Sequence, residues 1–312
     1  MEPYPYHDGQ RAIQQEANTV PVADRLSHWV GPVAQFATAA DFIVLASLCG
    51  SGELALTALS GPPPLVSVTT TEAGLLMRLP LAVSDHLGHD VACGGLVINI
   101  AAARRSRIAG MLTEDGACAQ LRCATAFTNC RKYVAPSVAI GGETMIGPTE
   151  VRPLAIDAPC LNECLAKAEL AFLATRNPAG MPDVSHRGGP AGFLSMNPGG
   201  NEITWIEYVG DGMFVSAGNL RACQQFTLVV PDLDSGGALE LVGRADYLTH
   251  ERWREPRSAA LLRGPKPFPK QGEVRGRVLR ANWLEGFCGP RRSQDRGARV
   301  TSCSALEEQE PL

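Results

Sequence analysis

Three consecutive side chains, Ser185, His186 and Arg187, carry the clearest anion-binding chemistry in the sequence. A hydroxyl and a guanidinium both donate hydrogen bonds, and the guanidinium adds a fixed positive charge, which suits a phosphate. Side chains alternate between the two faces of a strand, so Ser185 and Arg187 would share one face. We therefore expect this pair to bind the anion. His186 is then either a core histidine or a group directed to the opposite side.

A second basic group, Arg104, Arg105 and Arg107, follows the apolar run 94–100. Two interpretations stay open for it. Runs of charge are usually solvated, but one of these arginines could instead cross to the later half of the chain and complete the anion site. Lys132 and Tyr133 lie further on and could contact a ligand, although an exposed lysine is the simpler interpretation of Lys132.

Aromatic residues supply a third set of candidates. Trp205 and Tyr208 flank Glu207 and could stack on an aromatic ring, with Glu207 accepting a hydrogen bond from it. Aromatic residues on a barrel strand more often belong to the core, and this alternative is kept. His250, Trp253 and Trp283 are further candidates for a substrate pocket.

The sequence also repeats itself. Residues 42–68 and 170–196 align without a gap at an offset of 128 (170 − 42), with identical residues at six positions that include Gly52/Gly180 and Gly61/Gly189. Such a repeat predicts two copies of one folding unit. Thr57-Ala58-Leu59 stands where the second copy has Ser185-His186-Arg187, so we expect chemistry in one copy. Residues 107–110 are expected to correspond to 241–244.

Many short strand patterns at regular spacing, with few helices, predict an antiparallel barrel in each copy. We place the N-terminal copy at 1–134, a Pro- and Gly-rich linker at 135–160, the C-terminal copy at 161–288 and a mobile polar tail at 289–312. Residues 255–280 are expected to be irregular because Pro, Gly and Arg are frequent there. The two copies would pack as an internal pseudo-dimer.

Composition excludes several functions. The net charge of −4 over 312 residues argues against nucleic-acid binding. No apolar run approaches the roughly 20 residues of a membrane helix, and the polar N-terminus resembles no signal peptide. The ten cysteines include no CxxC pair, so we expect reduced thiols in a cytoplasmic protein without a metal site. Neither a dinucleotide fingerprint nor a P-loop is present.

Three segments, 183–196 (DVSHRGGPAGFLSM), 201–220 (NEITWIEYVGDGMFVSAGNL) and 239–247 (LELVGRADY), resemble the pyridoxamine 5′-phosphate oxidase-like family of flavin-binding split barrels. The first copy is similar to the extra half of its longer members, through 96–112 and 129–134. The resemblance covers about residues 5–288. It implies a mainly β (α+β) fold, a duplicated split β-barrel with short flanking helices.

The resemblance also implies a ligand, FMN, held at the interface between two barrels. Its cofactor-binding residues would be Ser185, His186, Arg187, Trp205, Ile206, Glu207, Gly210, Asp211, Met213 and Asn219, completed by Arg104, Arg105 and Arg107. Many relatives have Arg or Lys at the helix start where this chain has Gly212-Met213-Phe214. The catalytic candidates are His186, Lys132, Tyr133 and Tyr208.

We therefore predict an FMN-dependent oxidoreductase that transfers hydride between flavin and a small organic substrate, for which an aromatic compound is one candidate. O₂ or NAD(P)H would be the second redox partner, and a homodimer is compatible with the sequence. Two alternatives stay open. One is a cofactor-independent isomerase or cyclase that uses the same cavity, which the missing helix-start cation favours. The other is a non-catalytic flavin-binding protein.

Overall fold

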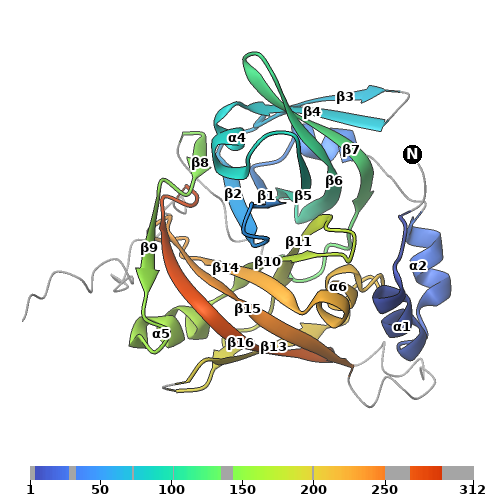
Figure 1. Ribbon diagram of the computed structural model, residues 1–312. Coiled ribbons are helices and arrows are strands. Elements are labelled where there is room, and N and C mark those ends of the chain that lie inside the picture. The colour runs from blue at the N-terminus through green and yellow to red at the C-terminus, as the bar shows by residue number, and fades with distance from the viewer. Residues whose placement is uncertain are drawn as a thin grey trace, which may run out of the picture.

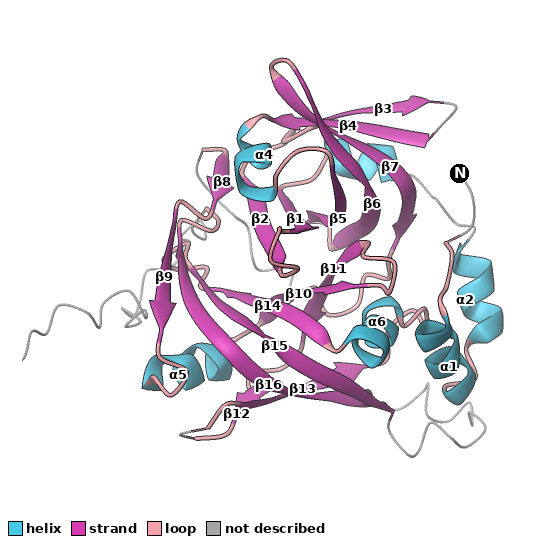
Figure 2. Ribbon diagram, viewed as in Figure 1, coloured by secondary structure: helices cyan, strands magenta, loops and turns pink. Residues whose placement is uncertain are grey.

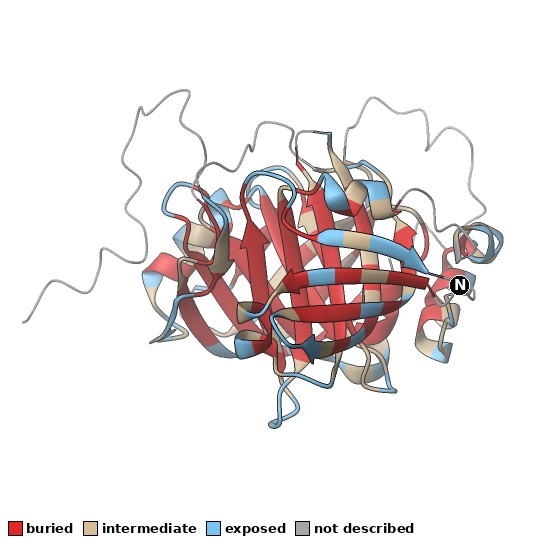
Figure 3. Cartoon of the chain, turned by 90° about the horizontal axis from the view of Figure 1, so that it is seen from above, coloured by how far each residue is buried: buried red, intermediate tan, exposed pale blue. Residues whose placement is uncertain are grey.

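The computed structural model describes residues 4–27, 33–71, 74–100, 102–134, 143–198, 200–249 and 268–289. Two curled antiparallel sheets dominate it, and short helices lie at their edges (Figures 1 and 2). Buried residues follow the strands, while exposed residues collect at the turns (Figure 3). The fold is mainly β, as predicted. The expected tail lies outside the described residues except for Gly289.

The first sheet has the strand order β3-β4-β7-β6-β5-β1-β2-β8. Helix α3 (Val33–Thr38) precedes it and α4 (Ala82–Leu87) lies between β4 and β5. Its strands are β1 (Phe42–Leu48), β2 (Leu54–Ser60), β3 (Ser67–Thr71), β4 (Gly74–Pro80), β5 (Val91–Asn99), β6 (Arg104–Asp115), β7 (Cys118–Thr128) and β8 (Met145–Gly147).

The second sheet has the order β11-β10-β14-β15-β16-β13-β12, with β9 (Glu150–Leu154) paired to β16. Helix α5 (Pro159–Lys167) precedes it and α6 (Val215–Cys223) lies between β13 and β14. Its other strands are β10 (Leu170–Arg176), β11 (Pro182–Gly188), β12 (Leu194–Met196), β13 (Glu202–Tyr208), β14 (Gln225–Pro231), β15 (Ala238–Thr249) and β16 (Lys270–Glu285).

The repeat seen in the sequence is a repeat of strand pairing. Leu45 pairs with Thr57 in the first sheet, and Leu173 pairs with Ser185 in the second, which preserves the offset of 128 on both strands. The remaining strands follow in the same spatial order. Two copies of one half-barrel therefore lie in one chain, and each places its second strand at the same relative position.

A bulge in each sheet corrects the expected correspondence between 107–110 and 241–244. The register shifts between Ala109 and Gly110 on β6, and between Val242 and Gly243 on β15. A Cβ atom at Gly110 would lie 1.8 Å from the Arg122 carbonyl oxygen, and one at Gly243 would lie 2.1 Å from that of Arg277. Gly110 thus corresponds to Gly243, one residue away from the sequence alignment.

Two segments expected to be irregular contain strands. The expected linker 135–160 holds β8, β9 and the start of α5, and β8 and β9 extend the two sheets. Strand β16 begins at Lys270 within the region 255–280, of which 255–267 lies outside the described residues. The copy boundaries stay a prediction.

An apolar seam joins the halves. Phe42 of β1 stacks on Phe172 of β10 with 5.2 Å between ring centroids. The backbones approach closely at β5 and β11, where a Cβ on Gly94 would lie 2.0 Å from the Pro182 carbonyl oxygen. Burying a Phe side chain contributes about 1.5–3 kcal/mol, so the seam holds the halves together as a continuous core.

Helix α1 (Asp8–Glu16) packs beside α6 of the second half, and α2 (Val20–Ser27) packs against α1 (Figure 1). His7 Nε2 and Gln10 Nε2 both contact Asn219 Oδ1, at 2.8 and 3.1 Å. A Cβ on Gly218 would overlap the Gln10 backbone. The N-terminal segment therefore supports the helix that borders the site described below.

No helix among the described residues is long and apolar enough to span a bilayer.

Candidate functional site

A pocket of about 100 Å³ opens at the seam between the two halves. The first half contributes residues from β6 and from the segment after β7, and the second half contributes the ends of β11 and β13 and the start of α6. Its polar lining includes Arg105, Arg107, Asn129, Cys130, Tyr133, His186, Arg187, Glu207, Tyr208, Asp211, Ser216 and Gln271. Three arginines from two half-barrels thus meet in one cavity.

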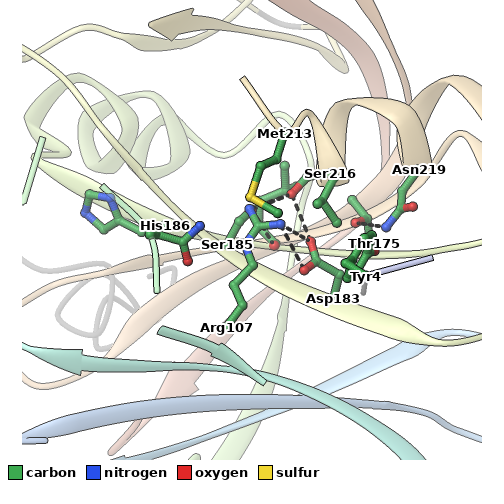
Figure 4. Close-up of polar contacts among 12 residues, drawn as sticks. Tyr4, Arg107, Thr175, Asp183, Ser185, His186, Met213, Ser216 and Asn219 are labelled. Atoms are coloured by element: carbon green, nitrogen blue, oxygen red, sulfur yellow. Dashed lines mark hydrogen bonds and ion pairs between the residues drawn. The ribbon is translucent and has the colours of Figure 1, made fainter. Parts of the chain in front are cut away.

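Arg107 crosses from the first half to the second. It forms an ion pair with Asp183 (Nη1 to Oδ1, 3.1 Å) and donates from Nη2 to Ser216 Oγ at 3.3 Å. Ser216 Oγ lies 2.8 Å from Ser185 Oγ and 2.9 Å from Asp183 Oδ2 (Figure 4). Arg107 Nε is buried and has no partner among the described residues. A cation from one copy therefore stands at the helix start of the other.

Arg187 joins this cluster from the second half. Its Nη1 donates to Ser185 Oγ at 2.8 Å, so the two residues share one face of β11, as alternation predicts. Its Nε contacts Glu207 Oε1 at 2.5 Å, and Trp205 Nε1 donates to the same oxygen at 2.9 Å. Glu207 therefore balances the charge of Arg187 and orients its guanidinium.

Arg105 and His186 form a buried pair on the side facing the first half. Arg105 Nη1 lies 2.9 Å from His186 Nδ1, and each residue is 9% exposed. Burial lowers the pKa of His186 well below its ordinary value, and Arg105 and Arg187 lower it further. The imidazole is therefore neutral, and its Nε2 has no partner among the described residues.

The start of α6 faces the pocket without a side-chain cap. Phe214, which precedes the helix, has a positive φ of 54° and makes no capping hydrogen bond, and residues 214–217 line the pocket. The first amides of a helix lack intrahelical acceptors and carry a partial positive charge. This helix start can therefore receive an anion.

Phenol rings line another part of the cavity. Tyr133 and Tyr208 lie 5.5 Å apart by ring centroid, and Phe268 packs against both. Burial raises the pKa of Tyr133 to about 12 and also raises that of Tyr208. Both phenols are thus protonated at neutral pH. Tyr133 Oη donates to the Val209 carbonyl at 2.9 Å, so its ring is held in place.

Several residues predicted for the site lie elsewhere. Arg104 packs on Phe36, 4.6 Å from the ring centroid, because strand alternation turns it away from Arg105. Trp205 is fully buried in the core of the second half, and Asn219 accepts a hydrogen bond from Gln10 of α1. Lys132 Nζ contacts the Val209 carbonyl at 3.3 Å and does not line the pocket. His250 and Trp253 lie outside the described residues, and Trp283 is a core residue.

Other residues of the pocket were not predicted. Asp183 and Ser216 organise the arginine cluster, and Asn129 holds Asp211 (Nδ2 to Oδ2, 3.0 Å). Asp183 sits two residues before Ser185, and strand alternation places it on the same face, which is a usable signal. Nothing in the sequence connects Ser216 with Arg107, because 109 residues separate them.

The equivalent residues on the other side of the seam lack this chemistry. Counting back from Gly243, Arg105 and Arg107 correspond to Ala238 and Glu240, and Arg187 corresponds to Leu59. Glu240 accepts from Asn282 Nδ2 at 2.7 Å, and burial raises its pKa. Strand β8 pairs with β2 there, with Thr57 Oγ1 donating to the Gly147 carbonyl. Among the described residues, the arginine cluster therefore lies on one side of the seam.

The described residues contain no group of three or more His, Cys, Asp or Glu residues that could hold a metal ion. No disulfide joins the cysteines in this part of the chain.

No protein-family model matches the sequence, and no curated protein matches it. Matches among solved structures include a candidate pyridoxamine 5′-phosphate oxidase from Lactobacillus delbrueckii (18% identity, 42% of this chain, 98% of the other, TM-score 0.30). They also include a FAD-binding protein from Mesorhizobium loti (16% identity, 43% of this chain, 96% of the other, TM-score 0.27). A third match is HutZ, the haem storage protein from Vibrio cholerae (17% identity, 42% of this chain, 96% of the other, TM-score 0.28). Pyridoxamine 5′-phosphate oxidase-like proteins, which the sequence resembles, are thus among the matches. At these TM-scores the split barrel is assigned from strand pairing alone.

Proposed function

We propose that the seam pocket binds FMN and that the protein is an FMN-dependent oxidoreductase acting on a small organic substrate. One observation carries the proposal: the uncapped start of α6 and three arginines from both halves line one cavity. Phosphate esters are recognised by charge-assisted donors and by helix starts. The sequence resemblance to flavin-binding split barrels points to the same ligand.

The residues present fit the phosphate of such a cofactor. Arg187, Ser185, Ser216 and Arg107 bring donors together, and the buried Nε of Arg107 still lacks an acceptor. Arg107 also supplies the cation that relatives place at the helix start. Gly188 lets the Tyr133 backbone approach β11 at the edge of the pocket, since a Cβ there would lie 2.3 Å from the Tyr133 carbonyl oxygen.

When bound, FMN would supply hydride-transfer chemistry. The chain would supply position and electrostatics. Tyr133 and Tyr208 offer protonated phenols and aromatic faces beside the pocket, and Ile206 offers an apolar wall. His186, neutral and fixed by Arg105, would direct an N–H donor rather than a charge. In this proposal Lys132 acts only by holding the Val209 segment, and the second redox partner is O₂ or NAD(P)H.

The absorption spectrum of the purified protein tests this proposal. We expect flavin bands after incubation with FMN and removal of the excess, and bleaching of those bands on addition of a reducing substrate. Bands that no substrate bleaches would leave a flavin-binding protein without oxidoreductase activity. Absence of any bound flavin would contradict the proposal.

A second candidate is a cofactor-independent isomerase that moves a proton in the same pocket. The small volume favours it, because ligand pockets for larger molecules usually measure roughly 300–1,000 Å³. A protein that retains no flavin but converts a substrate, with loss of activity in Tyr133→Phe, would support this candidate.

A further inference from the structure

Arg105 differs from the other two arginines of the pocket in having no carboxylate partner. Arg107 pairs with Asp183 and Arg187 pairs with Glu207. Within the described residues, no carboxylate lies within ion-pair distance of Arg105, whose neighbours are His186 Nδ1 and Cys130 Sγ (3.8 Å). A buried charge without a counter-charge is costly, so this position favours an anionic ligand.

Asp211 acts on Arg105 through space but has other hydrogen-bond partners. Burial lowers the pKa of Arg105, while Cys130 and Asp211 oppose that change through space. The carboxylate of Asp211 accepts from Asn129 Nδ2 at 3.0 Å and from the Met213 amide at 3.1 Å. These contacts hold Asp211 at the loop before α6 and away from the guanidinium.

His186 accepts a hydrogen bond from Arg105 and orients its guanidinium. A guanidinium only donates, so His186 Nδ1 must accept, and the neutral ring then carries its proton on Nε2. That buried Nε2–H has no acceptor among the described residues. In Figure 4 the His186 ring points away from the cluster of Arg107, Asp183 and Ser216. The pair is therefore separate from the proposed phosphate site.

We propose that Arg105, oriented by His186, forms a second anion subsite that binds a carboxylate, so that the substrate is a small carboxylic acid. The planar fork of a guanidinium matches the two oxygens of a carboxylate, and a positive charge without a carboxylate partner among the described residues matches its single negative charge. A cavity of about 100 Å³ suits a small group. The subsite deepens the proposed function, since it names the substrate class of the same pocket.

Benzoate and benzamide, which share a shape but differ in charge, test the subsite by calorimetry on the full-length protein. We expect benzoate to bind at least roughly tenfold more tightly than benzamide, as one charge-assisted contact would give. Arg105→Gln should abolish that preference and Arg105→Lys should keep part of it. Arg104→Gln, a change of the neighbouring arginine outside the pocket, should keep all of it.

Equal binding of benzoate and benzamide by the wild-type protein would overturn the subsite. So would a loss of the benzoate preference in Arg104→Gln as large as that in Arg105→Gln. Flavin retention is measured separately, by absorption. A protein that retains FMN without preferring benzoate would refute the subsite alone. One that prefers benzoate without retaining FMN would support the subsite and refute the proposed cofactor.

Discussion

Arg107 of the first half and Ser216 of the second, 109 residues apart in the sequence, meet at 3.3 Å across the seam. The arginine comes from a strand and the serine from the first turn of α6, so each half contributes one part of the arrangement. Asp183 holds both side chains. Neither copy of the repeat could build this cluster alone, which explains why a duplicated chain suits a single site.

The crossing arginine should therefore be required for flavin retention. We expect Arg107→Ala to weaken FMN binding roughly 10- to 100-fold, because charge-assisted hydrogen bonds contribute about 1.5–3 kcal/mol. Fluorescence titration with FMN would measure the change. Arg104→Ala is the matched control on the same strand, and an equal loss in both variants would show that only the general positive field matters.

Arg187 should contribute from the other half. Arg187→Ala removes the donor to Ser185 and leaves the half-buried Glu207 without its cation, so it should lose FMN affinity at least as strongly as Arg107→Ala. The double variant Arg187→Ala/Glu207→Gln removes the stranded charge and separates destabilisation from lost phosphate contact. Wild-type flavin occupancy in both variants would exclude a phosphate role for Arg187.

The close approach of the halves at Gly94 gives a test of the seam itself. A side chain there would overlap the Pro182 carbonyl, so Gly94→Ala should lower the free energy of unfolding by about 1–3 kcal/mol. Denaturant unfolding would measure it. At Gly50 an added Cβ meets nothing within 4 Å, and Gly50→Ala should change stability little. Equal stability of the two variants would contradict the close packing of β5 on β11.

Buried neutral His186 should make stability fall in mild acid. Its folded-state pKa lies below the ordinary value of 6.5, so the unfolded chain takes up the proton first as the pH falls. Stability present above pH 6.5 is then lost below it, by up to about 1.4 kcal/mol per pH unit. The charged groups that act on the ring are Arg105 and Arg187, and both lower its pKa.

Urea unfolding of the wild-type protein and of His186→Gln between pH 7 and 5 measures this effect. The variant should show a shallower decline, while His89→Gln, a change at an exposed histidine, should follow the wild type. Parallel curves for all three proteins would mean that His186 is accessible to protons in the folded state.

The sequence predicted the parts of the site that depend on local pattern. The offset of 128 placed β1, β2, β10 and β11, and strand alternation put Ser185 and Arg187 on one face. It could not predict Ser216 or the partner of Arg105, because those contacts join distant segments. The sequence did not predict strand β16, because Gly272, Gly276 and the exposed arginines interrupt its apolar pattern. The correspondence between Gly110 and Gly243 rests on a bulge that both strands share, which the sequence alone does not show.

The duplicated chain also shows how one of two equivalent sites can be lost. Ala238 and Glu240 stand where the seam pocket has Arg105 and Arg107, and β8 pairs with the strand that carries Leu59. A buried acid at that position repels a phosphate. The same fold therefore places arginines on one side of the seam and an alanine, a leucine and a glutamate at the equivalent positions on the other.

The number of flavins bound per chain tests the central claim most directly. Saturating FMN, followed by gel filtration and measurement of flavin absorbance against protein concentration, should give one flavin per chain for the wild-type protein and far less for Arg107→Ala. A stoichiometry of two would contradict the loss of the second site, and no retained flavin would contradict the assignment of the seam pocket to FMN.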